Sequence, residues 1–353
     1  MSGFTRHTQI FQRSVAPALA EGRRIAYFLV DALRYELAAE FRQRLPDTLK
    51  ATLEPALAQI PTITPVGMAA LLPDAHGKLR LRAERDGLAP HIGDTRVASA
   101  AERVAHVERL HGDRVAAVDL DDLLKTRKPR LRDTVHLLLV KTTEIDTAGE
   151  HMADAALGIM QGVLEKFLRA LKVLQDLGFR QAVFAADHGF LLLSEQLPGD
   201  KVEKPRGQWL LSKVRSLLGS GAAGPGSLRF APEDLGLAGD LQDVVVPDSL
   251  GAFRTGETFM HSGLSLPECM IPVLSVALGQ PTTSRRTSAQ LQLQYRGGKT
   301  RHITTKNPMI EVILFQQEMF ATALSFRLEV RAGKKPVGQV WPPPPRWTPP
   351  PVW

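Results

Sequence analysis

Cysteine is almost absent from this chain of 353 residues, and Cys269 is the single residue of this type. One cysteine excludes an intrachain disulfide and a zinc site built from thiolates. A metal site in this protein must therefore use carboxylate, imidazole or hydroxyl ligands.

Long apolar runs are absent as well. No run approaches the roughly 20 residues that a membrane helix needs. Residues 1–20 contain Arg6 and Arg13 and have no apolar core of a signal peptide. We therefore expect a cytoplasmic protein that is not attached to a membrane.

Acidic residues are scarce in the last part of the chain. From residue 281 to the end, eleven Lys and Arg stand against three Glu, a net charge of +8. The whole chain carries +7, so the rest is close to neutral. Such a basic segment either contacts nucleic acid or forms an ordinary solvated surface. Its aromatic residues are few, so we expect base stacking to contribute little.

The chain length and a hydrophobic fraction of 44% predict one large domain and a smaller part. The composition changes near residue 280. We expect the following division: a large domain over 1–279, a polar linker over 280–290, a small and incomplete β module over 291–341, and a proline-rich tail over 342–353. Within the β module, strands are expected at 291–295, 309–315 and 324–330.

The large domain shows buried strands alternating with helices. The strongest strand is Ile25–Val30, a continuous apolar run rich in β-formers. Further strands are expected at 51–57, 115–118, 134–140, 181–186 and 270–276, and a rim hairpin within 78–97. Ser99 and Glu102 are spaced as a capping box for a helix over 99–110. The alternation predicts an α/β fold with a mainly parallel sheet flanked by helices. Residues 196–258 are rich in Gly and Pro and are expected to be an irregular cap, with a short amphipathic piece at 209–218.

Acids and imidazoles follow the ends of these strands. Asp31 ends the first strand, where it is either a helix cap or a ligand. The other residues of this kind are Asp146, Glu150, His151, Asp187 and His188, and His261 comes before the last strand. Each signal is weak alone, but together they predict one cluster at one edge of the sheet. Carboxylates and imidazoles suit zinc or manganese, and two such ions suit phosphoryl transfer.

Two further residues have a functional and a structural interpretation. Thr64 precedes Pro65 at a predicted helix start, where it is either the nucleophile of a metal-assisted reaction or a simple N-cap. Arg34 lies three residues after Asp31, so it either binds a substrate phosphate or pairs with Glu36 or Asp47 on the surface.

The order Asp, Thr, Asp-x-x-Gly, Asp-His-Gly, His resembles the alkaline phosphatase superfamily. Three stretches look like the PglZ domain of BREX-type phage-defence systems: Val-Asp-Ala-Leu-Arg-Tyr-Glu at 30–36, Pro-Thr-Ile-Thr-Pro-Val-Gly-Met-Ala-Ala-Leu-Leu-Pro at 61–73, and His-Ser-Gly-Leu-Ser-Leu-Pro-Glu at 261–268. The resemblance covers residues 23–278. Members of this family are usually longer, so we expect a fragment, a frameshifted product or a reduced paralogue.

The resemblance implies an alkaline-phosphatase-like fold with a two-metal centre. One metal would take Asp31, Thr64, Asp187 and His188. The other would take Asp146, His261 and a group near Gly149. The superfamily often reads Asp-x-x-Gly-His, whereas Glu150 separates Gly149 from His151 here. Either Glu150 or His151 fits as the ligand, with a slight preference for His151.

The implied activity is metal-dependent hydrolysis of a phosphodiester, of the nuclease kind, with Thr64 as nucleophile and Arg34 beside it. The two ions would be zinc, or alternatively manganese. Expected partners are other subunits of the defence system, and nucleic acid through the basic C-terminal segment. The alternatives are a phosphomonoesterase and a non-catalytic scaffold subunit. An intact ligand set favours the enzyme.

Overall fold

The computed structural model describes residues 3–125, 131–152, 155–195, 197–279, 290–295, 310–315, 331–332 and 335–336. Its chain forms two compact units, Met1–Thr282 and Thr283–Trp353. No helix within these described residues is both long enough and apolar enough to cross a bilayer.

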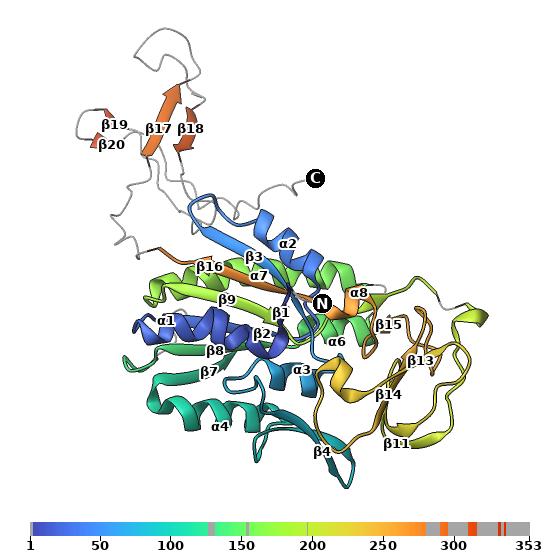
Figure 1. The fold of residues 1–353 in the computed structure, drawn as a ribbon. Coiled ribbons are helices and arrows are strands. Elements are labelled where there is room, and N and C mark those ends of the chain that lie inside the picture. Colours follow the sequence, from blue (N-terminus) through green and yellow to red (C-terminus); the bar gives the residue numbers. More distant parts are fainter. Residues whose placement is uncertain are drawn as a thin grey trace. The chain divides into compact units, whose positions relative to one another are not determined.

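A seven-stranded mixed sheet forms the centre of the first unit (Figure 1). In spatial order its strands are β1 (Thr5–Arg6), β3 (Lys50–Leu57), β16 (Met270–Ala277), β9 (Gln181–Ala186), β2 (Ile25–Val30), β8 (Leu137–Thr142) and β7 (Val115–Asp119). Strand β16 pairs antiparallel with both β3 and β9, and every other neighbouring pair is parallel. The prediction of a mainly parallel sheet is therefore confirmed, with β16 alone running in the opposite direction.

The centre of the sheet is buried on both faces, as the apolar run of β2 predicts. Every residue of β2 is buried. On one face, Phe28 of β2 stacks on Phe184 of β9 with ring centroids 4.0 Å apart. Phe41 of α2 (Tyr35–Gln43) and Phe167 of α7 (Ala156–Asp176) close on the same pair of rings. Helices α2 and α7 thus cover this face of the sheet.

A second layer of helices covers the opposite face, toward which Tyr27 points because neighbouring strand residues alternate. Phe11 of η2 (Phe11–Val15) meets the Tyr27 ring edge-on at 6.0 Å, and helix α1 (Ala16–Ala20) follows η2 directly. The Tyr27 hydroxyl donates to the Leu71 carbonyl, 3.2 Å away, at the end of α3 (Thr64–Ala70). Helix α4 (Ala100–His111) joins this layer through a hydrogen bond between His106 and the Pro73 carbonyl.

The predicted hairpin and capping box are confirmed. The hairpin consists of β4 (Leu79–Glu84) and β5 (Gly87–Ile92), with β6 (Thr95–Arg96) beside β5. At the start of α4 the Glu102 amide donates to Ser99 Oγ at 3.2 Å, and the Ser99 amide donates to Glu102 Oε2 at 2.8 Å. This reciprocal pair satisfies two amides that a helix start leaves open.

The prediction of an irregular cap over residues 196–258 is wrong. This region contains a four-stranded sheet in the order β11 (Gly207–Ser212), β12 (Leu217–Gly221), β14 (Asp243–Pro247), β13 (Ser227–Phe230). The apolar residues of 209–218 resemble a helical stripe. A turn closed by the Lys213 amide and the Ser216 carbonyl at 2.8 Å divides them into the hairpin β11–β12. The glycines and prolines belong largely to the turns between strands.

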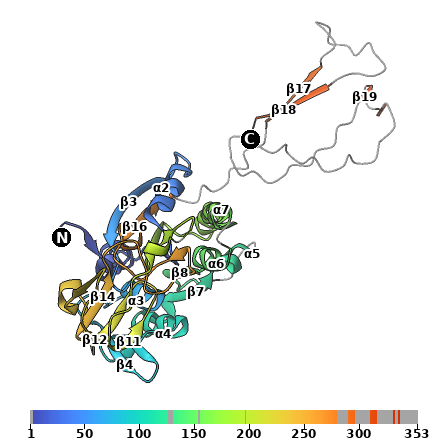
Figure 2. The ribbon, with the colours of Figure 1, turned by 90° about the vertical axis from the view of Figure 1, so that its right-hand side faces the viewer.

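The cap sheet packs against the segment that leads into α3. Its residues Leu218, Val244 and Val246 share a core cluster with Ile60 and Ile63. The cap strands and α3 lie on the same side of the first unit (Figure 2). The position of Thr64, the first residue of α3, therefore depends on the cap as well as on the central sheet.

The second unit contains the strand pair β17 (Gln290–Tyr295) and β18 (Ile310–Phe315). The two strands are antiparallel, with Gln290 opposite Phe315. A short pair, β19 (Arg331–Ala332) and β20 (Lys335–Pro336), is also present. Strands were predicted at 291–295 and 309–315. The predicted strand at 324–330 and the proline-rich tail at 342–353 lie outside the described residues.

Candidate metal centre

The predicted site residues gather at the edge of the sheet where the parallel strands end. Asp31 follows β2, Asp187 and His188 follow β9, and Thr64 begins α3 after β3. Asp146 lies in α6 (Glu144–His151), which follows β8. Because β16 runs in the opposite direction, the segment that precedes it reaches this same edge. His261, just before β16, thereby joins residues that come after the other strands.

Asp31, Asp187 and His188 form the first potential metal-binding group, with ligand atoms within 4.8 Å of one another and all three side chains buried. Asp187 Oδ1 accepts from the Ala32 amide at 3.0 Å and from the His188 amide at 2.9 Å. Ala32 has a φ of 59°, in the left-handed region that non-glycine residues rarely adopt. This unusual turn brings the amide that follows Asp31 onto Asp187, so the ends of β2 and β9 are joined.

The tautomer of His188 leaves a lone pair toward the carboxylates. Its Nδ1 lies 3.0 Å from the Gly189 carbonyl, so this nitrogen carries the proton of the neutral ring. Nε2 then faces Asp187 Oδ2 at 3.4 Å and Asp31 Oδ1 at 3.7 Å. Burial lowers the pKa of His188 well below its ordinary value, with a smaller effect from His261 in the same direction. The Nε2 lone pair therefore lies beside oxygens of both carboxyl groups.

Asp146, His188 and His261 form the second group, again with ligand atoms within 4.8 Å. The His188 and His261 rings are stacked, with centroids 4.2 Å apart and an interplanar angle of 6°. His261 Nδ1 donates to the Thr62 carbonyl at 2.8 Å, which directs the lone pair of the neutral ring to Nε2.

Burial raises the pKa of the three carboxyl groups above their ordinary range. For Asp31 the shift is large, and the nearby Asp187 and Asp146 charges add to it. Burial raises the pKa of Asp187 to about 7 and also raises that of Asp146. Like charges placed this closely disfavour the ionised forms, and a cation between them would reverse that effect.

The donor set fits divalent metal ions. Within the part of the chain that the structure describes, Asp187 Oδ2 and Asp146 Oδ1 are buried without a hydrogen-bond partner. Buried oxygens of this kind are costly unless something binds them. Carboxylate oxygens beside neutral imidazole nitrogens are ligands that zinc and manganese accept.

Thr64 lies against the first group. Its Oγ1 is 3.4 Å from Asp31 Oδ1 and 3.3 Å from His188 Nε2. The first turn of α3 can approach this closely because residue 67 is glycine. A Cβ at Gly67 would lie 2.3 Å from the Asp187 carbonyl oxygen. Gly67 is a site-forming residue that sequence reasoning missed.

Glu150 and His151 do not join either group. Both lie at the exposed end of α6, where 48% of the Glu150 side chain and 70% of the His151 side chain are accessible to solvent. They still act on Asp146 at a distance, since Glu150 raises its pKa and His151 lowers it. The preceding Gly149 is packed under Phe259, and a Cβ there would lie 2.1 Å from that ring. The choice between Glu150 and His151 as a metal ligand stays a prediction.

Arg34 makes the surface ion pair that was the alternative to phosphate binding. Its Nη2 lies 2.6 Å from Glu36 Oε1, and its Nε lies 3.1 Å from Glu36 Oε2. The guanidinium also lies over the Phe190 ring, 5.3 Å from its centroid. Binding of a substrate phosphate by Arg34 stays a prediction and would require it to leave Glu36.

Three more residues around His261 escaped sequence reasoning. Thr62 is fully buried, and its Oγ1 donates to the Gly263 carbonyl at 3.0 Å. Arg215 and Glu268 are a buried ion pair beside the same segment. Thr62 and Glu268 lie within the family-like stretches 61–73 and 261–268, and Glu268 is also spaced from Ser265 as a capping box at the start of α8 (Leu266–Cys269). Neither signal predicts their contacts with the His261 segment. Arg215 comes from the cap, 46 residues before His261 in the sequence, and has no such signal.

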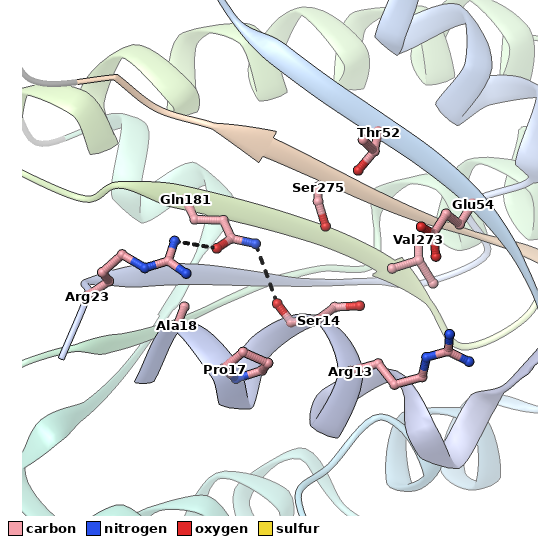
Figure 3. Close-up of a pocket in the computed structure, with 10 residues that line it drawn as sticks. All are labelled: Arg13, Ser14, Pro17, Ala18, Arg23, Thr52, Glu54, Gln181, Val273 and Ser275. Carbon is pink, nitrogen blue, oxygen red and sulfur yellow. Dashed lines mark hydrogen bonds between the residues drawn. The ribbon is translucent and has the colours of Figure 1, made fainter. Parts of the chain in front are cut away.

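A cavity of about 350 Å³ lies beside α1 and is separate from this centre (Figure 3). Side chains from β3, β9 and β16 form one wall, and Arg13 and Arg23 lie on the other side. Arg23 donates to Gln181 Oε1 at 3.2 Å. Gln181 begins β9, whereas Asp187 follows its end, and none of the metal-site residues lines the cavity.

The fold and the strand-end cluster define the alkaline-phosphatase-like class of domains. Residues 10–276 match the family described as the BREX system PglZ alkaline phosphatase-like domain. The chain belongs to this family. The match confirms the resemblance seen in the sequence and covers nearly all of the first unit.

Two curated relatives match most of the chain. It is 26% identical over 330 residues to the alkaline phosphatase-like protein PglZ of Bacillus cereus (strain H3081.97), covering 89% of this chain and 37% of that protein. It is 26% identical over 331 residues to the alkaline phosphatase-like protein BrxZ of Escherichia coli O9:H4 (strain HS), covering 88% and 36%. The chain thus spans little more than a third of the length of these relatives.

Solved structures with a similar fold include two hydrolases. Phosphonoacetate hydrolase from Sinorhizobium meliloti 1021 has a TM-score of 0.46 and 13% identity, over 72% of this chain and 89% of that chain. Human ectonucleotide pyrophosphatase/phosphodiesterase 5 has a TM-score of 0.48 and 11% identity, over 72% and 88%.

Proposed function

We propose that this chain is a metal-dependent phosphoric ester hydrolase of a BREX phage-defence system. Its substrate class is a phosphodiester, with nucleic acid as the natural source, and other subunits of the system are its partners. The observation that carries the proposal is that Asp31 and His188, which form one group with Asp187, both lie against the Thr64 hydroxyl. Family membership supports it.

Two divalent ions, zinc or manganese, would be held at this edge of the sheet. Asp31, Asp187 and His188 would hold one ion, and Asp146 and His261 would hold the other. When bound, such ions lower the pKa of a hydroxyl or water and offset the charge that develops on a transferring phosphoryl group. The residues of the chain hold the ions in place and accept the proton of the nucleophile.

Thr64 is the nucleophile of the proposed reaction. A free threonine hydroxyl is a poor nucleophile, so it needs an activating neighbour. Its proton leaves toward Asp31 Oδ1, the acceptor 3.4 Å away. Thr64 Oγ1 then bonds to phosphorus while the bond from phosphorus to the leaving oxygen breaks, and that alkoxide takes a proton from water.

The second half of the reaction restores the enzyme. Water attacks the phosphorus of phosphothreonine 64, the bond from phosphorus to Oγ1 breaks, and Oγ1 regains a proton. The products are one alcohol and one phosphomonoester. The Gly189 carbonyl fixes the His188 ring, so Nε2 keeps its direction toward the metal position in both halves of the reaction.

The test compares Thr64→Ala, Thr64→Ser and the wild-type chain after loading with zinc or manganese. Hydrolysis is measured on bis(p-nitrophenyl) phosphate and on p-nitrophenyl phosphate. Thr64→Ala should reduce diester hydrolysis by at least about a thousandfold because the nucleophile is gone. Thr64→Ser should retain part of the activity because a hydroxyl remains. The matched control is Thr52→Ala, an exposed threonine of β3.

The outcomes separate the candidate functions. Faster turnover of the monoester than of the diester would make the chain a phosphomonoesterase. Metal binding without turnover of either substrate would make it a scaffold subunit. Equal rates for Thr64→Ala and the wild type would leave Thr64 as the start of α3 and nothing more.

A further inference from the structure

The segment His261–Ser265 carries one of the proposed metal ligands, yet it belongs to no long regular element. His261 follows the two-residue strand β15 (Phe259–Met260). Ser262 has a φ of 88°, in the left-handed region, and is buried. Such a backbone persists only when its surroundings fix it. The contacts around this segment therefore decide where the His261 ring lies.

On one side the segment is held by Thr62. The Thr62 carbonyl accepts from His261 Nδ1 at 2.8 Å, and the Thr62 hydroxyl donates to the Gly263 carbonyl at 3.0 Å. The first bond fixes the direction of the His261 ring. The second bond fixes the backbone at Gly263.

On the other side the segment is held by the Glu268 carboxylate. Glu268 is fully buried, and its Oε1 accepts from the Gly263 amide at 2.8 Å while its Oε2 accepts from the Ser265 amide at 3.0 Å. A buried carboxylate needs a compensating positive charge. The compensating charge is Arg215, whose Nε lies 3.1 Å from Oε1 and 3.2 Å from Oε2.

Arg215 connects this arrangement to the cap. It is 1% exposed and lies in the turn between β11 and β12. Its guanidinium also donates to the carbonyls of Gly251 and Ser249, and its backbone amide donates to Ser262 Oγ at 3.1 Å. A Cβ at Gly263 would lie 2.7 Å from Arg215 Nε, so only glycine leaves room for the guanidinium there.

We infer that Arg215 and Glu268 are positioning residues for the second metal, acting through His261. The inference rests on the proposed function, since it takes His261 as a metal ligand. Docking of the cap turn brings Arg215 to Glu268 and completes the ion pair. The paired Glu268 carboxylate fixes the amides of Gly263 and Ser265. The segment fixed in this way directs His261 Nε2 toward Asp146 and His188. Cap position and metal affinity are therefore coupled in this chain.

The first experiment measures metal affinity. Zinc is titrated calorimetrically into metal-free protein, for the wild type, Arg215→Met, Arg215→Lys and Ser262→Ala. Arg215→Met should weaken the second binding event about 10- to 100-fold and leave the first unchanged, because only His261 depends on the pair. Arg215→Lys should recover part of the loss by keeping the charge. Ser262→Ala, which spares the ion pair, should give a smaller loss in the same event.

The control is Arg254→Met, which breaks an exposed ion pair with Glu257 elsewhere in the cap region. It should leave both events unchanged. In a double-mutant cycle, adding Arg215→Met to His261→Ala should cause no further loss. Wild-type affinity for both ions in Arg215→Met, or equal weakening of both, would overturn the inference.

The second experiment needs no metal and separates the two proposals. Nitrogen-15 NMR of the imidazoles reports which ring nitrogen of His261 carries the proton. The wild type should show the Nδ1-protonated tautomer alone, and both Arg215→Met and Ser262→Ala should show exchange between tautomers. Absence of both zinc and manganese binding in the wild type would refute the proposed function, while an unchanged tautomer in both variants would refute the positioning role.

Discussion

Acidification should destabilise this protein through a histidine that lies outside the ligand set. His7, in the short helix η1 (His7–Gln9), is 1% exposed, and its Nδ1 accepts from the Gln59 amide at 3.0 Å. Burial lowers the pKa of His7 from 6.5 to about 3, and the backbone of Ala186 offsets this only in part. Ala186 immediately precedes Asp187, and His7 is near enough to His188 to lower the pKa of that residue slightly.

The sign and size of the effect follow from the two pKa values. The folded state keeps His7 neutral, whereas the unfolded chain takes up a proton near pH 6.5. The stabilisation is therefore complete above pH 6.5 and is lost as the pH falls toward 3. At 1.36 kcal/mol per pH unit, the loss is about 2 kcal/mol at pH 5 and about 4 kcal/mol at pH 3.

The assay is urea unfolding of metal-free protein at pH 8, 7, 6 and 5, for the wild type and for His7→Asn. Asparagine keeps an acceptor near the position of Nδ1 and does not titrate. Its smaller volume lowers stability by a constant amount at every pH. The site carboxyls act in the opposite sense, since a raised pKa favours the folded state as the pH falls. They are common to both proteins and cancel in the difference.

The difference in unfolding free energy between wild type and variant should be constant above pH 7 and should shrink by about 2 kcal/mol by pH 5. Parallel pH profiles down to pH 5 would refute the reasoning, because they would mean that His7 is either solvated or paired in the folded state.

Three other outcomes are expected. Gly67→Ala should cost about 1–3 kcal/mol of unfolding free energy in urea, because its Cβ meets the Asp187 backbone. The control is Gly162→Ala on α7, where a Cβ meets open space, and it should raise the unfolding free energy by up to about 1 kcal/mol. An unchanged unfolding free energy in Gly67→Ala would contradict the close approach of α3 to Asp187. Zinc at a hundredfold excess over its dissociation constant should add about 2.7 kcal/mol per site, seen as a higher Tm that EDTA reverses, and an unchanged Tm would argue against a preformed centre. Replacing Arg285, Arg286, Lys299 and Arg301 with glutamine should weaken the salt dependence of polynucleotide binding. The slope of log binding constant against log salt concentration should fall by about 0.9 for each phosphate that the protein no longer neutralises. An unchanged slope would assign those charges to solubility alone.

The gathering of Asp31, Asp187 and His188 at one edge of the sheet could be predicted because the signals for it are local. The run before Asp31 and the run before Asp187 are apolar enough to identify central strands. The carboxyl ends of parallel strands meet at one edge by the geometry of the sheet. Thr64 was identified in the same way, from the proline that follows it at a helix start.

The rest depends on contacts between distant segments. Nothing in residues 270–277 reveals that β16 enters the sheet antiparallel, since a buried strand reads the same in either direction. The cap strands were missed because the short runs around Trp209 and Leu217 match a helical stripe as well as a hairpin. The burial of Arg215 against Glu268 joins positions 53 residues apart, and only the folded cap brings them together.

The place of β16 in the sheet also sets the order in which the site can be assembled. This strand separates β3, which leads to Thr64, from β9 and β2, which lead to Asp187 and Asp31. Its pairings with β3 and β9 involve residues that are synthesised last in the first unit. In a nascent chain that ends before residue 270, Thr64 and the carboxylates therefore follow strands that β16 has not yet joined into one sheet. The two pieces are joined only when β16 has been synthesised, so the strand-end cluster forms late in the synthesis of the first unit.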